Sequence, residues 1–160
     1  MSSKKHKIPQ KLFVLKTYKN LSQIETVLIN IAQKNDHPFQ LSILAKLTSN
    51  KNGHKKLKAD IKKQLSTILG AKFQLGFFFN PEIGSLFIAG HLTPMFLTKV
   101  NNKELASLPA GISALFRGLG INTKYINGLL TELKNNSYCL IIRGERTAFT
   151  IIESILNLHS

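Results

Sequence analysis

The pattern of apolar and polar positions predicts a strand, a helix and a second strand in the first third of the chain. Residues 11–18 (KLFVLKTY) are apolar and β-prone, which indicates the first strand. Ser22 and Glu25 then form a capping-box pattern, and apolar residues recur at helical spacing to about residue 34. Residues 39–47 alternate between apolar and polar side chains, so they predict a strand with one covered face.

The next segment predicts an amphipathic basic helix. After a loop at residues 49–53, one apolar stripe runs along the helix, and the opposite face carries lysines; the stripe consists of Leu57, Ile61, Leu65, Ile68 and Leu69. Such a helix either docks by its stripe on the body of the protein or lies on a membrane or a partner.

Two uncharged segments fill the middle of the chain. Residues 83–98 hold no formal charge, but they are interrupted by Gly84, Gly90 and Pro94 and fall short of the roughly 20 residues that a transmembrane helix needs. Residues 85–89 fit a buried strand better. Residues 105–116 form the second uncharged segment, which we expect to be helical after Pro109, so that the two segments make a small helical hairpin.

The last third predicts a helix, a strand and a terminal helix. Asn122 or Thr123 can cap a helix that ends near residues 135–136. Residues 138–143 (YCLIIR) predict a strand, and Gly144 the turn that leads into a helix over residues 147–158. The apolar face of the first of these helices is expected to consist of Tyr125, Ile126, Leu129, Leu130 and Leu133.

This order of elements is typical of the ferredoxin-like α+β fold, with four strands in one sheet and helices covering one face. We expect a basic, flexible arm at residues 1–10 and a single domain over residues 11–160, with an insertion at about residues 50–120. An apolar sheet face left open by this plan would be covered by a second copy, by a partner or by the insertion itself.

Three short motifs resemble those of the bacterial general-stress-protein family of small ferredoxin-like proteins, which carry a glycine-rich apolar insertion. They are residues 85–92 (SLFIAGHL), the small-residue stretch around residues 110–119, and residues 119–121 (LGI), which lead through a helix to residues 137–144. His91 and Asn122 stand where the family pattern has prolines. The resemblance implies the fold, a bacterial cytosol and a stress-related or membrane-linked role, and it supplies no catalytic residues.

Composition sharpens this picture mainly through charge. The chain of 160 residues has a net charge of +14, yet residues 1–72 hold 15 basic and three acidic residues, whereas residues 73–160 are nearly neutral. Such asymmetry indicates an anionic partner. The candidate residues for binding an anionic surface are Lys51, Lys55, Lys56, Lys58, Lys62 and Lys63. The candidates for apolar docking are Phe87, Leu92, Met95, Phe96, Leu115 and Phe116.

No pattern for catalysis, a cofactor or a metal is visible. The five histidines form no pair at helical ligand spacing, the eight carboxylates are scattered, and residues 118–120 (GLG) fit a helix end better than a phosphate loop. His91 is the one histidine within an apolar segment. Cys139 is the only cysteine, which excludes an intramolecular disulfide, and we expect it to be an inert buried thiol.

The sequence therefore favours a non-enzymatic accessory or regulatory binding module that is homo-oligomeric and cytoplasmic, with peripheral contact to the inner membrane. It would dock on a protein partner or on an anionic membrane surface. Two alternatives stay open: a nucleic-acid-binding protein that uses the lysine-rich helix, and a regulator that senses a small molecule.

Overall fold

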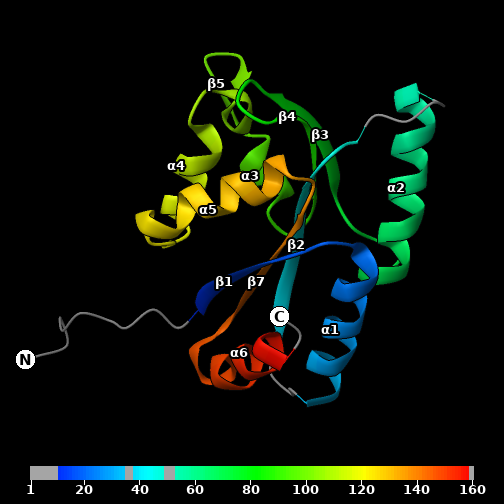
Figure 1. The fold of residues 1–160 in the computed structure, drawn as a ribbon, viewed down its shortest axis with the longest axis vertical. Helices are drawn as coiled ribbons and strands as arrows, with labels where there is room; N and C mark the ends of the chain where they lie inside the picture. Colours follow the sequence, from blue (N-terminus) through cyan, green and yellow to red (C-terminus); the bar gives the residue numbers. More distant parts are fainter. Residues whose placement is uncertain (1–10, 35–37, 49–52, 159–160) are drawn as a thin grey trace, which may run out of the picture.

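The computed structural model describes residues 11–34, 38–48 and 53–158, with only the backbone described at residues 11, 53–56 and 158. Its centre is a five-stranded antiparallel sheet in the order β1-β7-β2-β4-β3 (Figure 1). The strands are β1 (Lys11–Tyr18), β2 (Phe39–Lys46), β3 (Leu75–Asn80), β4 (Gly84–Gly90) and β7 (Tyr138–Glu145). A separate short hairpin joins β5 (Lys99–Val100) to β6 (Lys103–Glu104).

Helices cover both faces of this sheet (Figure 1). One face carries α1 (Leu21–Lys34), α2 (Gly53–Leu69) and α6 (Phe149–Leu158), which follows the short 3₁₀ turn η2 (Arg146–Ala148). The other face carries α3 (Thr93–Phe96), the 3₁₀ turn η1 (Leu105–Ser107), α4 (Gly111–Gly118) and α5 (Thr123–Lys134). The expected insertion thus covers the face that would otherwise be open.

The expected α+β class is confirmed, but the sheet has five strands where four were predicted. The additional strand is β3, because the Phe77–Phe79 run pairs with β4 along its whole length. Two strand-helix-strand units follow one another on the same face, and each is split by a later strand. Strand β7 lies between β1 and β2, and β4 lies between β2 and β3.

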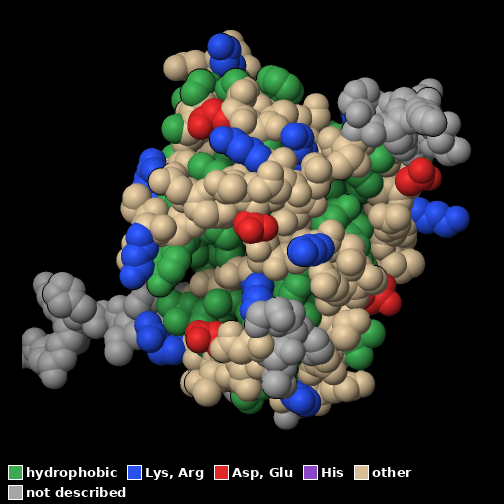
Figure 2. All heavy atoms as spheres, viewed as in Figure 1, with side chains coloured by type: hydrophobic (Ala, Val, Ile, Leu, Met, Phe, Trp, Pro, Cys, Tyr) green, Lys and Arg blue, Asp and Glu red, His purple; other side chains and the backbone are tan. Residues whose placement is uncertain are grey.

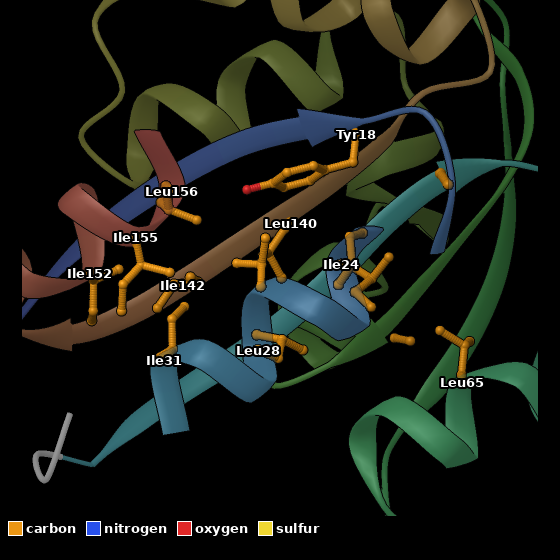
Figure 3. Close-up of a cluster of buried hydrophobic side chains, with 14 of the residues drawn as sticks. Tyr18, Ile24, Leu28, Ile31, Leu65, Leu140, Ile142, Ile152, Ile155 and Leu156 are labelled. Carbon is orange, nitrogen blue, oxygen red and sulfur yellow. The ribbon is translucent and has the colours of Figure 1, made fainter. Parts of the chain in front are cut away.

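Side chains alternate between the two faces of each strand and feed two separate cores. Figure 3 shows the core beneath α1 and α6, where Ile24, Leu28 and Ile31 approach Leu140 and Ile142 of the central strand β7. The other core lies on the opposite face of the sheet, beneath the insertion and α5. Its large buried side chains include Leu86, Ile88, Phe96, Phe116 and Leu133. Both faces of β2, β4 and β7 are buried, and β4 and β7 are accordingly apolar runs without alternation. The alternation of β2 predicted one covered face, which is wrong, because Ser42 and Leu44 on its other face are buried too.

The helix starts differ slightly from the sequence prediction. At α1 the cap is Asn20, whose Oδ1 accepts the Gln23 backbone N–H at 3.0 Å, and the Gln23 side chain in turn accepts the Lys19 and Asn20 N–H groups. This is the same reciprocal capping as the predicted Ser22 and Glu25 box, two residues earlier. At α5 the expected cap is confirmed, since Asn122 Oδ1 accepts the Lys124 N–H at 3.1 Å.

The predicted helical hairpin in the middle of the chain is wrong in its details. Residues 83–98 supply β4 and the single turn α3, and the β5–β6 hairpin replaces a helix, with Asn101 and Asn102 both at positive φ in its turn. Among the described residues, no helix is long and apolar enough to span a bilayer. Gly90 is required at the end of β4, because its φ is +104° and a Cβ there would collide with the Leu41 carbonyl oxygen.

The buried Asn80 fixes the insertion to the sheet. Its Nδ2 donates to the carbonyl oxygens of Ala106 at 2.8 Å and Leu108 at 3.2 Å, and its Oδ1 accepts the Glu82 N–H at 2.9 Å. The Glu82 carboxylate then accepts the Ala110 N–H at 2.6 Å, where Ala110 adopts the left-handed conformation that starts α4. This chain of bonds holds η1 beside β3, so the segment after β6 lies along that edge of the sheet.

Candidate docking surfaces

The first candidate surface is the lysine face of α2. Lys58, Lys62 and Lys63 are exposed there, whereas Leu57 and Leu65 of the apolar stripe are buried and Ile61, Ile68 and Leu69 are half-buried. The stripe thus docks on the body of the protein, as the first alternative predicted. Lys51 lies outside the described residues, and the side chains of Lys55 and Lys56 also lie outside them.

The described lysines of α2 are available to an external anion. Lys62 and Lys63 form no ion pair within the part of the chain that the structure describes, and Asp60 is the only acidic residue on the helix. Lys63 also lies at the rim of a cleft of about 550 Å³ between α1 and α2, where Glu25 is the single carboxylate. Figure 1 shows α2 along one side of the molecule, beside the outer strand β3.

An exposed aromatic side chain lies two residues along β3 from the ring that Lys58 contacts. The Lys58 ammonium sits over the ring of Phe77 on β3, 4.7 Å from its centroid. Phe79 points to the same side of β3, about 7 Å further along the strand, because side chains repeat every second residue. Phe79 is 60 % exposed, the largest exposed fraction among the large apolar side chains described, so the surface combines positive charge with one open aromatic ring.

Five of the six residues predicted for apolar docking are core residues. Phe87 and Phe96 are fully buried, and Leu92, Leu115 and Phe116 are at most 5 % exposed. Phe87 lies in the core beneath α1, α2 and α6, and the other four lie in the core on the opposite face of the sheet, where α3, α4 and α5 pack. They therefore form no exposed docking surface in this fold. Met95, on α3, is the exception, with 41 % of its surface exposed.

The second candidate surface was not predicted from the sequence, and it surrounds the outer strand β1. On the insertion side, a groove of about 590 Å³, here called the α5 groove, separates β1 from α5. Figure 2 shows apolar side chains in this hollow, between α5 and the part of the molecule that holds β1 and α6. Its lining is Phe13, Val14, Leu15, Thr17, Gly120, Ile121, Asn122, Tyr125, Gly128, Leu129 and Glu132.

A second groove lies on the opposite side of the same strand. This α6 groove has a volume of about 710 Å³ and is bordered by Leu12 of β1 and by Phe149 and Glu153 of α6, among others. Lys16 of β1 spans to the end of α6, where its Nζ donates to the Leu156 carbonyl oxygen at 2.9 Å. The Lys16 charge is thus directed at a helix C-terminus, which favours a cation, rather than at the open edge of the strand.

The remaining candidates for chemistry in the described chain are Cys139, His91 and residues 118–120. Cys139 is completely buried, so the expectation of a buried core thiol is confirmed, and desolvation raises the pKa of this thiol to about 12. The structure gathers no group of three potential metal ligands among residues 11–34, 38–48 and 53–158. His91 is exposed at the end of β4, and Gly118 and Gly120 lie at the end of α4, as predicted.

One buried polar atom has no described partner. The Tyr18 ring lies between the sheet and α6, close to Leu140 and Leu156 (Figure 3), and its hydroxyl makes no hydrogen bond to a described group. Burial raises the pKa of Tyr18 to about 12, so this phenol stays neutral at physiological pH.

Comparison with known proteins does not extend this description: no protein family, curated protein or solved structure matches the chain. The resemblance to the general-stress-protein family therefore rests on its short motifs alone.

Proposed function

We propose that the protein is a non-enzymatic binding module that docks on an anionic membrane surface through the outer face of α2 and the adjoining end of β3. The observation that carries the proposal is the exposed Phe79, two residues along β3 from Phe77, whose ring lies under Lys58. Lys62 follows Lys58 one helical turn later on the same face of α2, whereas Lys63 is exposed on the side of α2 that borders the cleft to α1. Lysines at a bilayer surface attract anionic headgroups, and an aromatic side chain among them can enter the headgroup region.

The distribution of charge supports a surface rather than a small ligand. The three described lysines of α2 lie within residues 58–63 and are all exposed, and no pocket among the described residues is lined by more than one of them. Each lysine near an anionic bilayer contributes on the order of 1 kcal/mol. Three lysines thus account for roughly a hundredfold in the partition coefficient, enough for reversible peripheral binding.

We further propose that the protein is cytoplasmic, binds the inner face of the membrane and has a stress-related role. We also propose that it is related to ferredoxin-like proteins. Support for that relationship comes from the β1-α1-β2 unit with β7 inserted between its strands, which is the split unit that such proteins contain.

Vesicle sedimentation tests the proposal with variants of equal charge. The triple variant Lys58→Gln/Lys62→Gln/Lys63→Gln should bind vesicles of phosphatidylcholine and phosphatidylserine roughly a hundredfold more weakly than the wild type. The control replaces three exposed lysines elsewhere, Lys99, Lys103 and Lys134, by Gln and should bind nearly as well as the wild type.

Salt and the aromatic side chain provide two further readouts. Binding of the wild type should fall steeply as salt rises and should vanish on phosphatidylcholine alone. Phe79→Ala should weaken binding without changing its salt dependence. Equal losses in the two triple variants would show that only net charge matters and would refute the docking face. Salt-sensitive binding to single-stranded RNA without binding to anionic vesicles would refute the membrane proposal in favour of nucleic acid.

A further inference from the structure

The outer edge of β1 is unpaired within the described chain. β1 pairs with β7 through all eight of its residues and with no other strand. The opposite edge of the sheet, β3, differs, because η1 packs against it and Asn80 bonds to that segment. Strand edges with free N–H and C=O groups readily pair with another chain, and proteins normally cover them or interrupt them with proline or a bulge. β1 carries neither proline nor a bulge.

The layers on both faces of the sheet cover β1 only in part. Phe13 and Leu15 face the α5 groove and Leu12 faces the α6 groove, and all three remain half-buried. An approaching strand would therefore gain main-chain hydrogen bonds and apolar contacts on both faces at once.

Gly128 gives the α5 groove a feature that the single chain does not explain. It lies inside α5, where glycine is less stable than alanine by about 1 kcal/mol, and a Cβ there would meet no atom within 4 Å. Within one copy, then, no close contact requires glycine. Gly128 lines the groove three residues after Tyr125, which is 59 % exposed. Because Gly128 has no side chain, another chain can approach the backbone of α5 closely at this position.

Charge at this edge suits a second copy of the same chain. The net charge of +14 opposes self-association. Three of the seven described acidic residues nevertheless lie around β1: Glu132 in the α5 groove, Glu153 in the α6 groove and Glu145 on β7. Four described cations lie in the same region, namely Lys16 on β1, Arg143 on β7, Arg146 in the α6 groove and Lys124 at the start of α5. Opposite charges are therefore nearly balanced among the described side chains at the β1 edge.

We propose that two copies of the protein associate through antiparallel pairing of their β1 strands about a two-fold axis near Val14 and Leu15. The two sheets then form one continuous antiparallel sheet, and the same patch serves both copies, as in an isologous dimer. Because β7 follows α5 and starts opposite Tyr18, the Glu132 end of α5 lies toward Tyr18. The two-fold axis therefore brings the Lys124 end of one α5 toward Glu132 of the partner subunit, which pairs opposite charges.

Sedimentation equilibrium and light scattering test this dimer without any lipid, so the result is independent of the proposed membrane function. The wild type should be a dimer at about 100 μM. Gly128→Arg places a long, helix-favouring side chain into open space in the single copy but into the partner in the dimer, so this variant should be monomeric at the same concentration. Asn127→Arg is the matched control, because its neighbouring position is exposed outside the groove, and it should remain dimeric.

Hydrogen exchange identifies the interface directly. Amides on the outer edge of β1 should become more protected as the protein concentration rises, while amides of β3 should not change. A wild type that stays monomeric at about 100 μM would overturn the proposal. So would dimers of equal strength in both arginine variants, or concentration-dependent protection that is absent from β1.

Discussion

The buried thiol of Cys139 should make the stability of this protein fall at alkaline pH in a way that one substitution removes. Cys139 lies on the central strand β7, completely buried in the core beneath the insertion. Burial raises the pKa of its thiol from 9.0 to about 12, since the thiolate cannot be solvated there. Stability from the neutral thiol is fully present below pH 9.0 and is lost as the pH rises from 9.0 toward 12.

The size of this effect follows from the shift. Each pH unit above 9.0 removes roughly 1.4 kcal/mol, so the wild type loses about 3 kcal/mol by pH 11. In Cys139→Ala this loss is absent, but one buried heavy atom is removed, which costs about 1 kcal/mol at neutral pH. The variant should therefore be less stable than the wild type at pH 7.5, equally stable near pH 10, and more stable at pH 11.

Urea unfolding of both proteins over this pH range, with a phosphine reductant present, measures the difference in the free energy of unfolding. Tyr18 and Tyr138 also have raised pKa values through burial, but they are present in both proteins, so their contribution cancels in the difference. If the difference between the two proteins does not change with pH, the thiol is not desolvated and the reasoning fails.

Two further substitutions test the packing of the insertion, both by urea unfolding. Asn80→Ala removes three hydrogen bonds of a buried side chain and should lower the free energy of unfolding by about 2–4 kcal/mol. The control Asn127→Ala, on the exposed side of α5, should change the free energy of unfolding by under about 0.5 kcal/mol. Equal losses in the two variants would contradict the role of Asn80 in holding the insertion to the sheet. Gly90→Ala should lower the free energy of unfolding more than Gly70→Ala does. Both glycines have positive φ, but only at Gly90 would a Cβ collide with the Leu41 carbonyl oxygen. Similar losses in the two variants would show that backbone strain alone accounts for the destabilisation.

The elements with one buried face were predictable from the sequence. The helix α2 has the predicted bounds within a few residues, because its stripe obeys a single period of apolar positions. The strand β1 has the predicted bounds because it is a short run of β-prone residues bounded by polar ones. The fifth strand was missed, because Phe77–Phe79 is a short apolar run without alternation, and such a run has no period that distinguishes a strand from a buried helix.

The candidate sites were predictable where charge decides and not where packing decides. Lysines on the outer face of an amphipathic helix have to face solvent, so Lys58, Lys62 and Lys63 lie where the helical pattern puts them. Exposure of an apolar side chain depends on what packs over it. Phe87 was expected at the surface but is fully buried, and Tyr125 was expected in the core but is exposed.

One signal of the groove was present in the sequence. Gly128 interrupts an otherwise regular amphipathic helix, which is unfavourable unless a close approach requires it. The unpaired edge of β1 had no such signal, because the order of strands in the sheet depends on where the C-terminal strand inserts.

That insertion also constrains how the chain can be made. β7 begins at residue 138 of 160 and supplies the hydrogen-bonding partner for one edge of β2 and for the whole of β1. During synthesis, the first strand-helix-strand unit therefore waits, with two unpaired edges facing each other, until β7 has left the ribosome. Contacts of such long sequence separation slow folding, and the open edges are exposed to misassembly throughout the delay. A chaperone that binds nascent chains would protect this protein most by shielding β1 and β2 during that interval.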